Sequence, residues 1–176
     1  MNNLQAFQGH AESIRDVTFA PNDARFATGS DDGTIKIWNF EEMREEKTLT
    51  GHGWDVKCVK WHPTKGLLVS GSKDNLVKFW DPRTSKVLTT LFVSSLHPFL
   101  VAFDVMNRHG HKNTVQACAW SPSGNLVATA SRDQLVKVFD IRAMKELVTL
   151  RGHKKEVCCT SSPPLSQIQR LIQDGK

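Results

Sequence analysis

Residues 51–81 read G-H-G-W-D-V-K-C-V-K-W-H-P-T-K-G-L-L-V-S-G-S-K-D-N-L-V-K-F-W-D, and apolar and polar residues alternate in three short runs. Alternation with a period of two predicts β-strands that bury one face. The first run stops at Pro63, which has no backbone N–H to donate to a central strand. A tight turn that contains Asp74 separates the second run from the third. The segment therefore predicts a small antiparallel sheet.

The same marks recur along the chain. Gly-His occurs at residues 9–10, 51–52, 110–111 and 152–153, with spacings of 42, 59 and 42 residues. After each of the first three pairs, a Ser or Thr, an Asp and an aromatic residue follow at constant distances. These sets are His10, Thr28, Asp32 and Trp38, then His52, Ser70, Asp74 and Trp80, then His111, Thr129, Asp133 and Phe139. A pattern that keeps phase three times indicates an internal structural repeat.

Each repeat contains four strand-like runs and no helical segment. Four short strands in about 42 residues are typical of one blade of a β-propeller. We therefore predict an all-β chain that forms part of a propeller, with three four-stranded repeats, the start of a fourth and an incomplete ring. The predicted repeats are residues 1–50, 51–91 and 109–150, and residues 151–159 begin a further repeat. Open blades leave sheet edges unpaired, which predicts low stability for the isolated chain.

Two segments interrupt the pattern. Residues 92–108 lengthen the second spacing, and deleting them restores T-T-L-H-G-H-K, which parallels T-L-T-G-H-G and T-L-R-G-H-K. They form either a long apolar loop or a translated intron that keeps the reading frame. Residues 160–176 lack the Asp and Trp marks, and we expect an irregular tail there.

The composition is that of an ordinary globular protein. The chain has 176 residues with 39% hydrophobic and 23% charged residues. The mainly apolar run 92–106 is too short and too polar to span a bilayer, and the N-terminus has no secretory signal pattern. We therefore expect no membrane contact. The four cysteines show no C-x-x-C pair, which favours structural thiols in a reducing compartment.

The charge is distributed unevenly. The formal net charge is +5, but residues 1–50 carry five basic and nine acidic side chains, whereas residues 51–91 carry seven basic and three acidic ones. This asymmetry is compatible with an anionic partner for the later repeats or with an ordinary solvated surface. The candidate partner or RNA contacts are Lys57, Lys60, Lys73, Lys112 and Arg132.

The recurring Ser/Thr, His and Asp do not predict an enzyme. A catalytic constellation is needed once, at a cleft, whereas this set returns in every repeat. His62 and His97 have no supporting cluster of metal ligands. We predict no catalytic residue, no cofactor and no bound metal or small-molecule substrate.

The Gly-His and Trp-Asp marks resemble the WD-repeat family over residues 4–91 and 109–159. The resemblance implies that the His, Ser/Thr, Asp and Trp of each repeat form a hydrogen-bonded set inside a blade. Such pairing is physically reasonable because a buried His, Asp or indole N–H needs a partner. In the third set Phe139 has no N–H, so we expect a shorter network of His111, Thr129 and Asp133.

Residues 51–84, 128–147 and 151–157 are similar to the WD-repeat subunits of the pre-mRNA cleavage and polyadenylation machinery, in their fungal form. That resemblance implies a non-catalytic nuclear scaffold that bridges RNA-recognition subunits and processing subunits. Its partners would be the other subunits, with pre-mRNA contacted here or only indirectly. The family also implies blades on both sides of this segment, a basic N-terminal extension and an internal Met1.

Two other classes of scaffold stay open. Trp80-Asp81-Pro82-Arg83 is a W-D-x-R sequence, which is frequent in WD-repeat substrate adaptors of cullin-type ubiquitin ligases. A general WD-repeat interaction scaffold is the other alternative, because a propeller fold by itself does not define a function.

Overall fold

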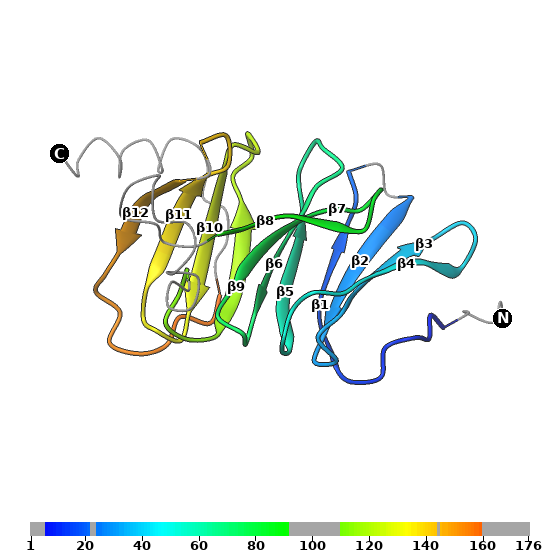
Figure 1. Ribbon diagram of the computed structural model, residues 1–176, viewed down its shortest axis with the longest axis horizontal. Helices are drawn as coiled ribbons and strands as arrows, with labels where there is room; N and C mark the ends of the chain where they lie inside the picture. The colour runs from blue at the N-terminus through cyan, green and yellow to red at the C-terminus, as the bar shows by residue number, and fades with distance from the viewer. Residues whose placement is uncertain (1–5, 22–23, 92–109, 144, 160–176) are drawn as a thin grey trace, which may run out of the picture.

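The computed structural model describes residues 6–21, 24–91, 110–143 and 145–159, and the regular structure in them consists of β-strands (Figure 1). The strands are β1 (Ile14–Phe19), β2 (Arg25–Ser30), β3 (Ile35–Asn39), β4 (Arg44–Leu49), β5 (Val56–Trp61), β6 (Leu68–Ser72), β7 (Val77–Asp81), β8 (Lys86–Leu91), β9 (Val115–Trp120), β10 (Leu126–Ser131), β11 (Val136–Asp140) and β12 (Lys145–Leu150).

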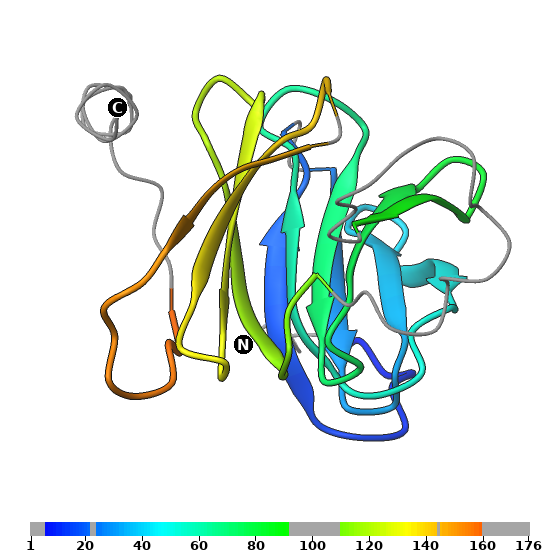
Figure 2. The ribbon, with the colours of Figure 1, turned by 60° about the vertical axis from the view of Figure 1, so that its left-hand side comes forward.

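The strands form three four-stranded antiparallel sheets, each built from consecutive strands. We call β1–β4 blade 1, β5–β8 blade 2 and β9–β12 blade 3. Figure 1 shows the blades side by side in chain order. Strands β1, β5 and β9 are neighbours, and the outer strands fan away from them in Figure 2. This is the arrangement of a β-propeller whose ring is not closed, so the predicted fold class is confirmed.

The turn between the second and third strands has the same geometry in each blade. Gly33, Asn75 and Gln134 occupy the same position of this turn and have φ angles of 78°, 70° and 69°. Their N–H groups donate to the carbonyls of Ser30, Ser72 and Ser131. A left-handed residue gives the tight reversal that the hairpin needs, and Gly and Asn adopt it at low cost.

Apolar side chains are buried mainly between blades. The cluster between blades 1 and 2 includes Ile35, Ile37, Leu49, Val56, Val59, Trp61 and Trp80. The cluster between blades 2 and 3 includes Val69, Val77, Phe79, Val115, Cys118, Trp120 and Phe139. Burying each large apolar side chain contributes about 1.5–3 kcal/mol, so the stability of one blade depends on its neighbours.

The outward face of β1 shows what a blade loses without a neighbour. Ile14, Val17 and Phe19 are 53%, 51% and 56% exposed. At the same positions of β5, Val56, Val59 and Trp61 are 0%, 0% and 8% exposed, because blade 1 covers them. The first blade therefore presents an apolar face that the described residues leave open.

Polar contacts also join the blades. Asp16 Oδ2 on β1 accepts the backbone N–H of Val59 on β5 at 2.9 Å, and Asp16 Oδ1 accepts Lys60 Nζ at 2.7 Å. Between blades 2 and 3, the Trp120 indole donates to the Lys60 carbonyl at 3.0 Å. These contacts fix the position of each inner strand relative to the next.

The outer strand of blade 1, β4, begins with the charged segment R-E-E-K, which does not alternate between apolar and polar residues. Residues 151–159, which are predicted to begin a further repeat, contain no strand in the structure, and their assignment to a repeat stays a prediction. A first strand pairs with the second strand of its own blade, and the described residues after 150 supply no such strand. The segment contacts blade 3 through the Val157 N–H, which donates to the Ser131 carbonyl, and through Glu156, which pairs with Arg132 at 2.9 Å.

Residues 92–108 and 160–176 lie outside the described residues, so the loop, intron and tail interpretations remain predictions. Within the described part of the chain, no helix is long and apolar enough to cross a membrane.

The packing between blades 2 and 3 yields a mutational test. A Cβ at Gly71 would lie 2.4 Å from Val115 Cγ1 and 2.8 Å from Cys58 Sγ, closer than real Cβ contacts allow. We expect Gly71→Ala to lower the free energy of unfolding by about 1–3 kcal/mol through overpacking. Denaturant unfolding measures the change. The matched control is Gly66→Ala, where nothing lies within 4 Å of the added Cβ. Equal stability of the two variants would contradict the packing described here.

Candidate functional site

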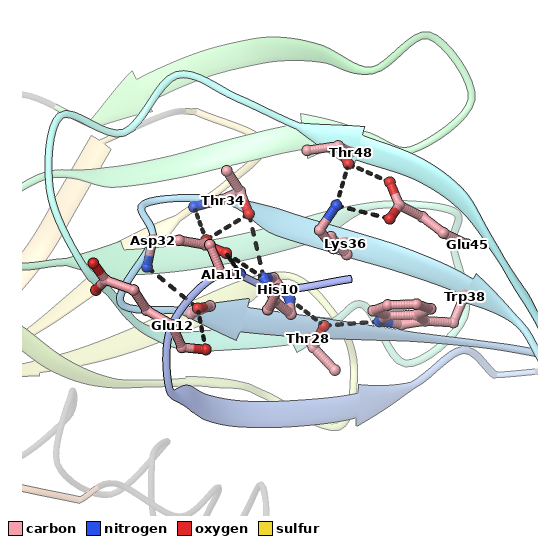
Figure 3. A network of polar contacts seen from close by, with 11 residues as sticks. His10, Ala11, Glu12, Thr28, Asp32, Thr34, Lys36, Trp38, Glu45 and Thr48 are labelled. Atoms are coloured by element: carbon pink, nitrogen blue, oxygen red, sulfur yellow. Dashed lines mark hydrogen bonds and ion pairs between the residues drawn. The ribbon is translucent and has the colours of Figure 1, made fainter. Parts of the chain in front are cut away.

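A buried polar network links the loop before the first strand of each blade to its second and third strands. In blade 1, His10 Nδ1 lies 2.8 Å from Asp32 Oδ2, and His10 Nε2 lies 2.7 Å from Thr28 Oγ1 (Figure 3). The Trp38 indole N–H donates to the same Thr28 hydroxyl at 2.8 Å. The structure thus brings the four recurring residues of the first repeat together.

The other two blades repeat this geometry. In blade 2, the distances from His52 to Asp74 and to Ser70 are both 2.7 Å, and the Trp80 indole donates to Ser70 at 2.8 Å. In blade 3, His111 lies 2.9 Å from Asp133 and 2.7 Å from Thr129. Phe139 is 1% exposed and has no N–H to donate. The Thr129 hydroxyl lies instead 3.4 Å from the Lys137 carbonyl.

The donor and acceptor roles follow from the chemistry of the groups. An ionised carboxylate only accepts, so the histidine Nδ1 donates to the aspartate and Nε2 accepts the Ser or Thr hydroxyl proton. The same hydroxyl accepts the indole N–H in blades 1 and 2. Asp32 also accepts the backbone N–H groups of Ala11 and Thr34, at 3.1 and 2.9 Å. Each aspartate therefore holds two loops of its blade together.

The pKa values agree with these roles. Burial raises the pKa of Asp32, but hydrogen bonds from Thr34, His10 and Ala11 outweigh it and hold the pKa at about 2. The pKa values of Asp74 and Asp133 are also lowered, because their hydrogen bonds again outweigh burial. Burial lowers the pKa of His111, against the attraction of Asp133. In blade 3, a neutral His111 paired with an ionised Asp133 is thus favoured at neutral pH.

This network is built for structure, because its hydroxyls are not available to a substrate. Thr28, Ser70 and Thr129 are 5%, 0% and 0% exposed. The Thr28 and Ser70 hydroxyls each bond to a histidine and accept an indole N–H, and the Thr129 hydroxyl bonds to His111 at 2.7 Å. A nucleophile has to reach the reacting carbon of its substrate. A buried and fully bonded hydroxyl does not meet that requirement.

A second network on the outer strands was not anticipated from the sequence. Lys36 Nζ donates to Glu45 at 2.7 Å and to Thr48 at 2.9 Å, as Figure 3 shows. Blade 3 repeats the ion pair with Lys137 and Glu146 at 2.9 Å. The spacing between Lys and Glu, which is the same in both repeats, is the signal that identifies it. In blade 2 that Glu is replaced by Val87, and Lys78 donates to the Gly51 carbonyl at 2.8 Å.

His62, a residue weighed as a metal ligand, is 1% exposed and engaged at both ring nitrogens. Its Nε2 lies 3.1 Å from the Gly124 carbonyl, and its Nδ1 accepts the N–H groups of Thr64 and Lys65 at 3.1 and 2.9 Å. His97 lies outside the described residues. In residues 6–21, 24–91, 110–143 and 145–159, no cluster of His, Cys, Asp and Glu could hold a metal ion.

The predicted partner contacts differ in exposure and pairing. Lys57 is not an exposed cation, since its side chain is 19% exposed and its Nζ lies 2.7 Å from Asp31 and 2.9 Å from Asp55. The other side chains are more exposed but three of them are also paired: Lys60 with Asp16 at 2.7 Å, Lys73 with Asp55 at 3.6 Å and Arg132 with Glu156 at 2.9 Å. Lys112 is exposed, and its backbone N–H donates to Asp133.

Three repeated antiparallel blades, each closed by a His, Asp and Ser/Thr network, define a WD-repeat β-propeller. The comparison with family models agrees, since residues 10–162 match the β-propeller model described as nucleolar protein 10-like, N-terminal domain. The chain belongs to this family of propeller scaffolds, which are generally non-catalytic.

Two kinds of curated protein are similar to this chain. Polyadenylation factor subunit 2 of Candida albicans is 43% identical over 166 residues, which cover 93% of this chain and 27% of that protein. Polyadenylation factor subunit 2 of Schizosaccharomyces pombe is 51% identical over 59 residues, or 32% of this chain and 12% of that protein. Nuclear distribution protein PAC1 of Arthroderma otae is 35% identical over 160 residues, with 84% of this chain and 31% of that protein covered. The chain thus spans about a third or less of these relatives.

The indole hydrogen bond of blade 2 is testable by a conservative substitution. Trp80→Phe keeps an aromatic ring but removes the five-membered ring and the N–H that donates to Ser70 in a buried site, and we expect it to lower the free energy of unfolding by about 1–3 kcal/mol. The measurement is denaturant unfolding at neutral pH. The control Trp54→Phe changes a side chain that is 59% exposed and should alter stability by less than about 0.5 kcal/mol. A Trp80→Phe variant as stable as this control would show that the bond contributes nothing.

The low pKa of Asp32 predicts a loss of stability in acid. Its pKa is about 2 in the folded chain and 3.8 for an ordinary Asp. The unfolded state therefore takes up a proton first, and stability present above about pH 4 is lost as the pH falls toward about 2. The contribution is on the order of 2 kcal/mol. We expect Asp32→Asn to be less stable than the wild type at neutral pH and the difference to shrink in this acidic window. A difference independent of pH would contradict the assignment.

Proposed function

We propose that this chain is part of a non-catalytic WD-repeat scaffold that acts in pre-mRNA 3′-end cleavage and polyadenylation in the nucleus. The observation that carries the proposal is the 43% identity to a polyadenylation factor subunit across 93% of the chain. The scaffold brings subunits that recognise RNA close to subunits that cut the transcript and add poly(A). Its partners are other subunits of that complex.

The structure supports a scaffold because the polar side chains that recur from repeat to repeat form hydrogen bonds and ion pairs within the chain. The His, Asp and Ser/Thr sets are buried, and the Lys and Glu pairs join neighbouring strands. What remains at the surface are loops that differ from repeat to repeat on a rigid framework. Variable loops on a fixed scaffold are the usual place for binding residues.

Direct RNA contact is the less favoured role for the predicted cations. Lys57, Lys60, Lys73 and Arg132 each lie within ion-pair distance of a carboxylate. Affinity for RNA depends on several cations that each neutralise a phosphate, and four cations that each lie beside a carboxylate leave little net charge for that purpose. We therefore propose that this segment works mainly through protein contacts and that pre-mRNA is reached indirectly.

A second scaffold class has specific support from the PAC1 relatives, which are named for nuclear distribution and are 35% identical over most of the chain. The W-D-x-R sequence offers weaker support for a ubiquitin-ligase adaptor. Trp80 is fully buried in the blade 2 network, while Arg83 is 81% exposed and lies 3.4 Å from Asp81. Only the arginine of that motif is thus free to meet a partner.

Co-purification separates these functions. We expect the full-length tagged protein to recover subunits of the cleavage and polyadenylation complex from nuclear extract, and its depletion to reduce cleavage and poly(A) addition on a reporter transcript. A paired purification with a tagged cullin tests the adaptor role. Recovery of nuclear-distribution or cullin partners, without processing subunits, would replace the proposal with one of the other scaffold classes.

A further inference from the structure

Trp54 differs from every other tryptophan of the chain. Its five tryptophans lie at positions 38, 54, 61, 80 and 120. Trp54 is 59% exposed, whereas the other four are between 0% and 8% exposed. Exposed tryptophan is costly to keep on a surface and is enriched at the centres of protein interfaces. The exposure therefore calls for an explanation beyond folding.

The fold does not need an indole at this position. Trp54 comes two residues after the His of its repeat, where blade 1 has Glu12 and blade 3 has Asn113. The structural work is done by the backbone: the carbonyls of Glu12, Trp54 and Asn113 accept the hydroxyls of Ser30, Ser72 and Ser131 at 3.2, 3.1 and 3.0 Å. The side chain at this position is free to vary between repeats.

These hydrogen bonds also fix the backbone that carries the indole. The neighbouring Gly53 N–H donates to Asp74 at 3.0 Å, so the loop is tied to the buried network of blade 2. A side chain held on a fixed backbone loses less conformational entropy when a partner binds. The position of Trp54 on the surface is thus set before a partner binds.

Charged residues beside Trp54 form a continuous chain from blade 1 to blade 2. Lys73 Nζ lies 5.2 Å from the centre of the Trp54 ring and 3.6 Å from Asp55. Asp55 pairs with Lys57 at 2.9 Å, Lys57 pairs with Asp31 at 2.7 Å, and Asp31 accepts Arg15 Nε at 2.6 Å.

Within this chain the cations lie outermost. The side chains of Arg15 and Lys73 are 47% and 45% exposed, whereas those of Asp31 and Asp55 are 12% and 17% exposed. Within this chain of ion pairs, the indole and two cations are therefore more exposed than the two carboxylates, and Glu12 of blade 1, at the position that Trp54 has in blade 2, is an exposed carboxylate outside the chain of pairs. Complementary charge on the partner is negative.

We propose that Trp54, Lys73 and Arg15 form a docking surface for a protein segment that carries a large apolar side chain next to Asp or Glu residues. The apolar side chain packs on the indole, and the carboxylates face Lys73 and Arg15. The inference rests on the proposed function, since the segment belongs to another subunit of the processing complex.

A protein segment fits this surface better than single-stranded RNA. The chain of ion pairs contains three cations and two carboxylates, so its net charge is only +1. RNA affinity depends on several cations that each neutralise a phosphate, together with stacked bases. A tryptophan surrounded by pre-paired charges is instead the usual composition of a protein contact.

The repeats themselves supply substitutions that should preserve folding. Trp54→Asn introduces the residue that blade 3 has at this position, and Lys73→Asp introduces the Asp31 of blade 1. The matched controls lie elsewhere on blade 2. Leu88→Asn removes an apolar side chain that is 56% exposed on β8, and Lys65→Asp reverses an exposed charge in the loop after β5.

The experiment is affinity purification of the full-length tagged protein with each variant, followed by quantification of every processing subunit. We expect Trp54→Asn combined with Lys73→Asp to lower recovery of one subunit by about tenfold, as loss of an interface anchor does. Leu88→Asn and Lys65→Asp should keep all subunits within about twofold. A photo-crosslinking residue at position 54 should react with that same subunit, at a segment rich in Asp or Glu, and one at position 88 should not.

Retention of every subunit within about twofold by the double variant would overturn the inference. So would crosslinks from position 54 to RNA, which would make single-stranded RNA the occupant. Failure of the wild-type protein to recover any processing subunit is a different result, because it refutes the proposed function and this inference falls with it.

Discussion

The hydrogen bond between histidine and aspartate within each blade is the contact on which the rest of the structure depends. His10, His52 and His111 lie in the loops that enter the blades, and their aspartates lie in the turns between the second and third strands. Each pair fixes the direction in which the chain leaves one blade and starts the next. The inner strands then meet their neighbours in register, and the apolar clusters between blades form. A local polar contact thereby controls long-range packing.

The sequence predicted this framework because every part of it repeats. Apolar alternation marked the inner three strands, and Gly-His and Asp marked the loops and turns that join them. It did not predict the full length of β4, because R-E-E-K-T-L lies at the outer edge, where exposed charged residues give no alternation. It also did not predict the pairing of Lys57 with Asp31, since these residues are brought together only by the packing of blade 2 on blade 1. Contacts between repeats depend on the blade-to-blade geometry, which no single repeat contains.

Comparison of the blades shows how one framework tolerates different chemistry. Blade 3 keeps the His111, Thr129 and Asp133 contacts without an indole, because the Thr129 hydroxyl has the Lys137 carbonyl as a further neighbour. Blade 2 has Val87 where the other blades have Glu45 and Glu146, and Val87 packs on the apolar cluster while Lys78 bonds to a backbone carbonyl. In each case the buried polar group that remains still has a partner, which is the condition for such a substitution to be tolerated.

The same reasoning separates the residues that form the fold from those that define a partner. A position whose side chain is buried and bonded in every blade is a poor carrier of specificity, because changing it destabilises the blade. The position two residues after each histidine is different, since a serine hydroxyl donates to its backbone carbonyl in every blade while its side chain differs between blades. The residue there is Glu12, Trp54 or Asn113. Evolution can change that side chain at little cost in stability. In a repeat protein, residues that recognise a partner are therefore expected at positions where the backbone is constant and the side chain varies. Trp54 is at such a position, and its exposed indole is not what an ordinary solvated surface carries.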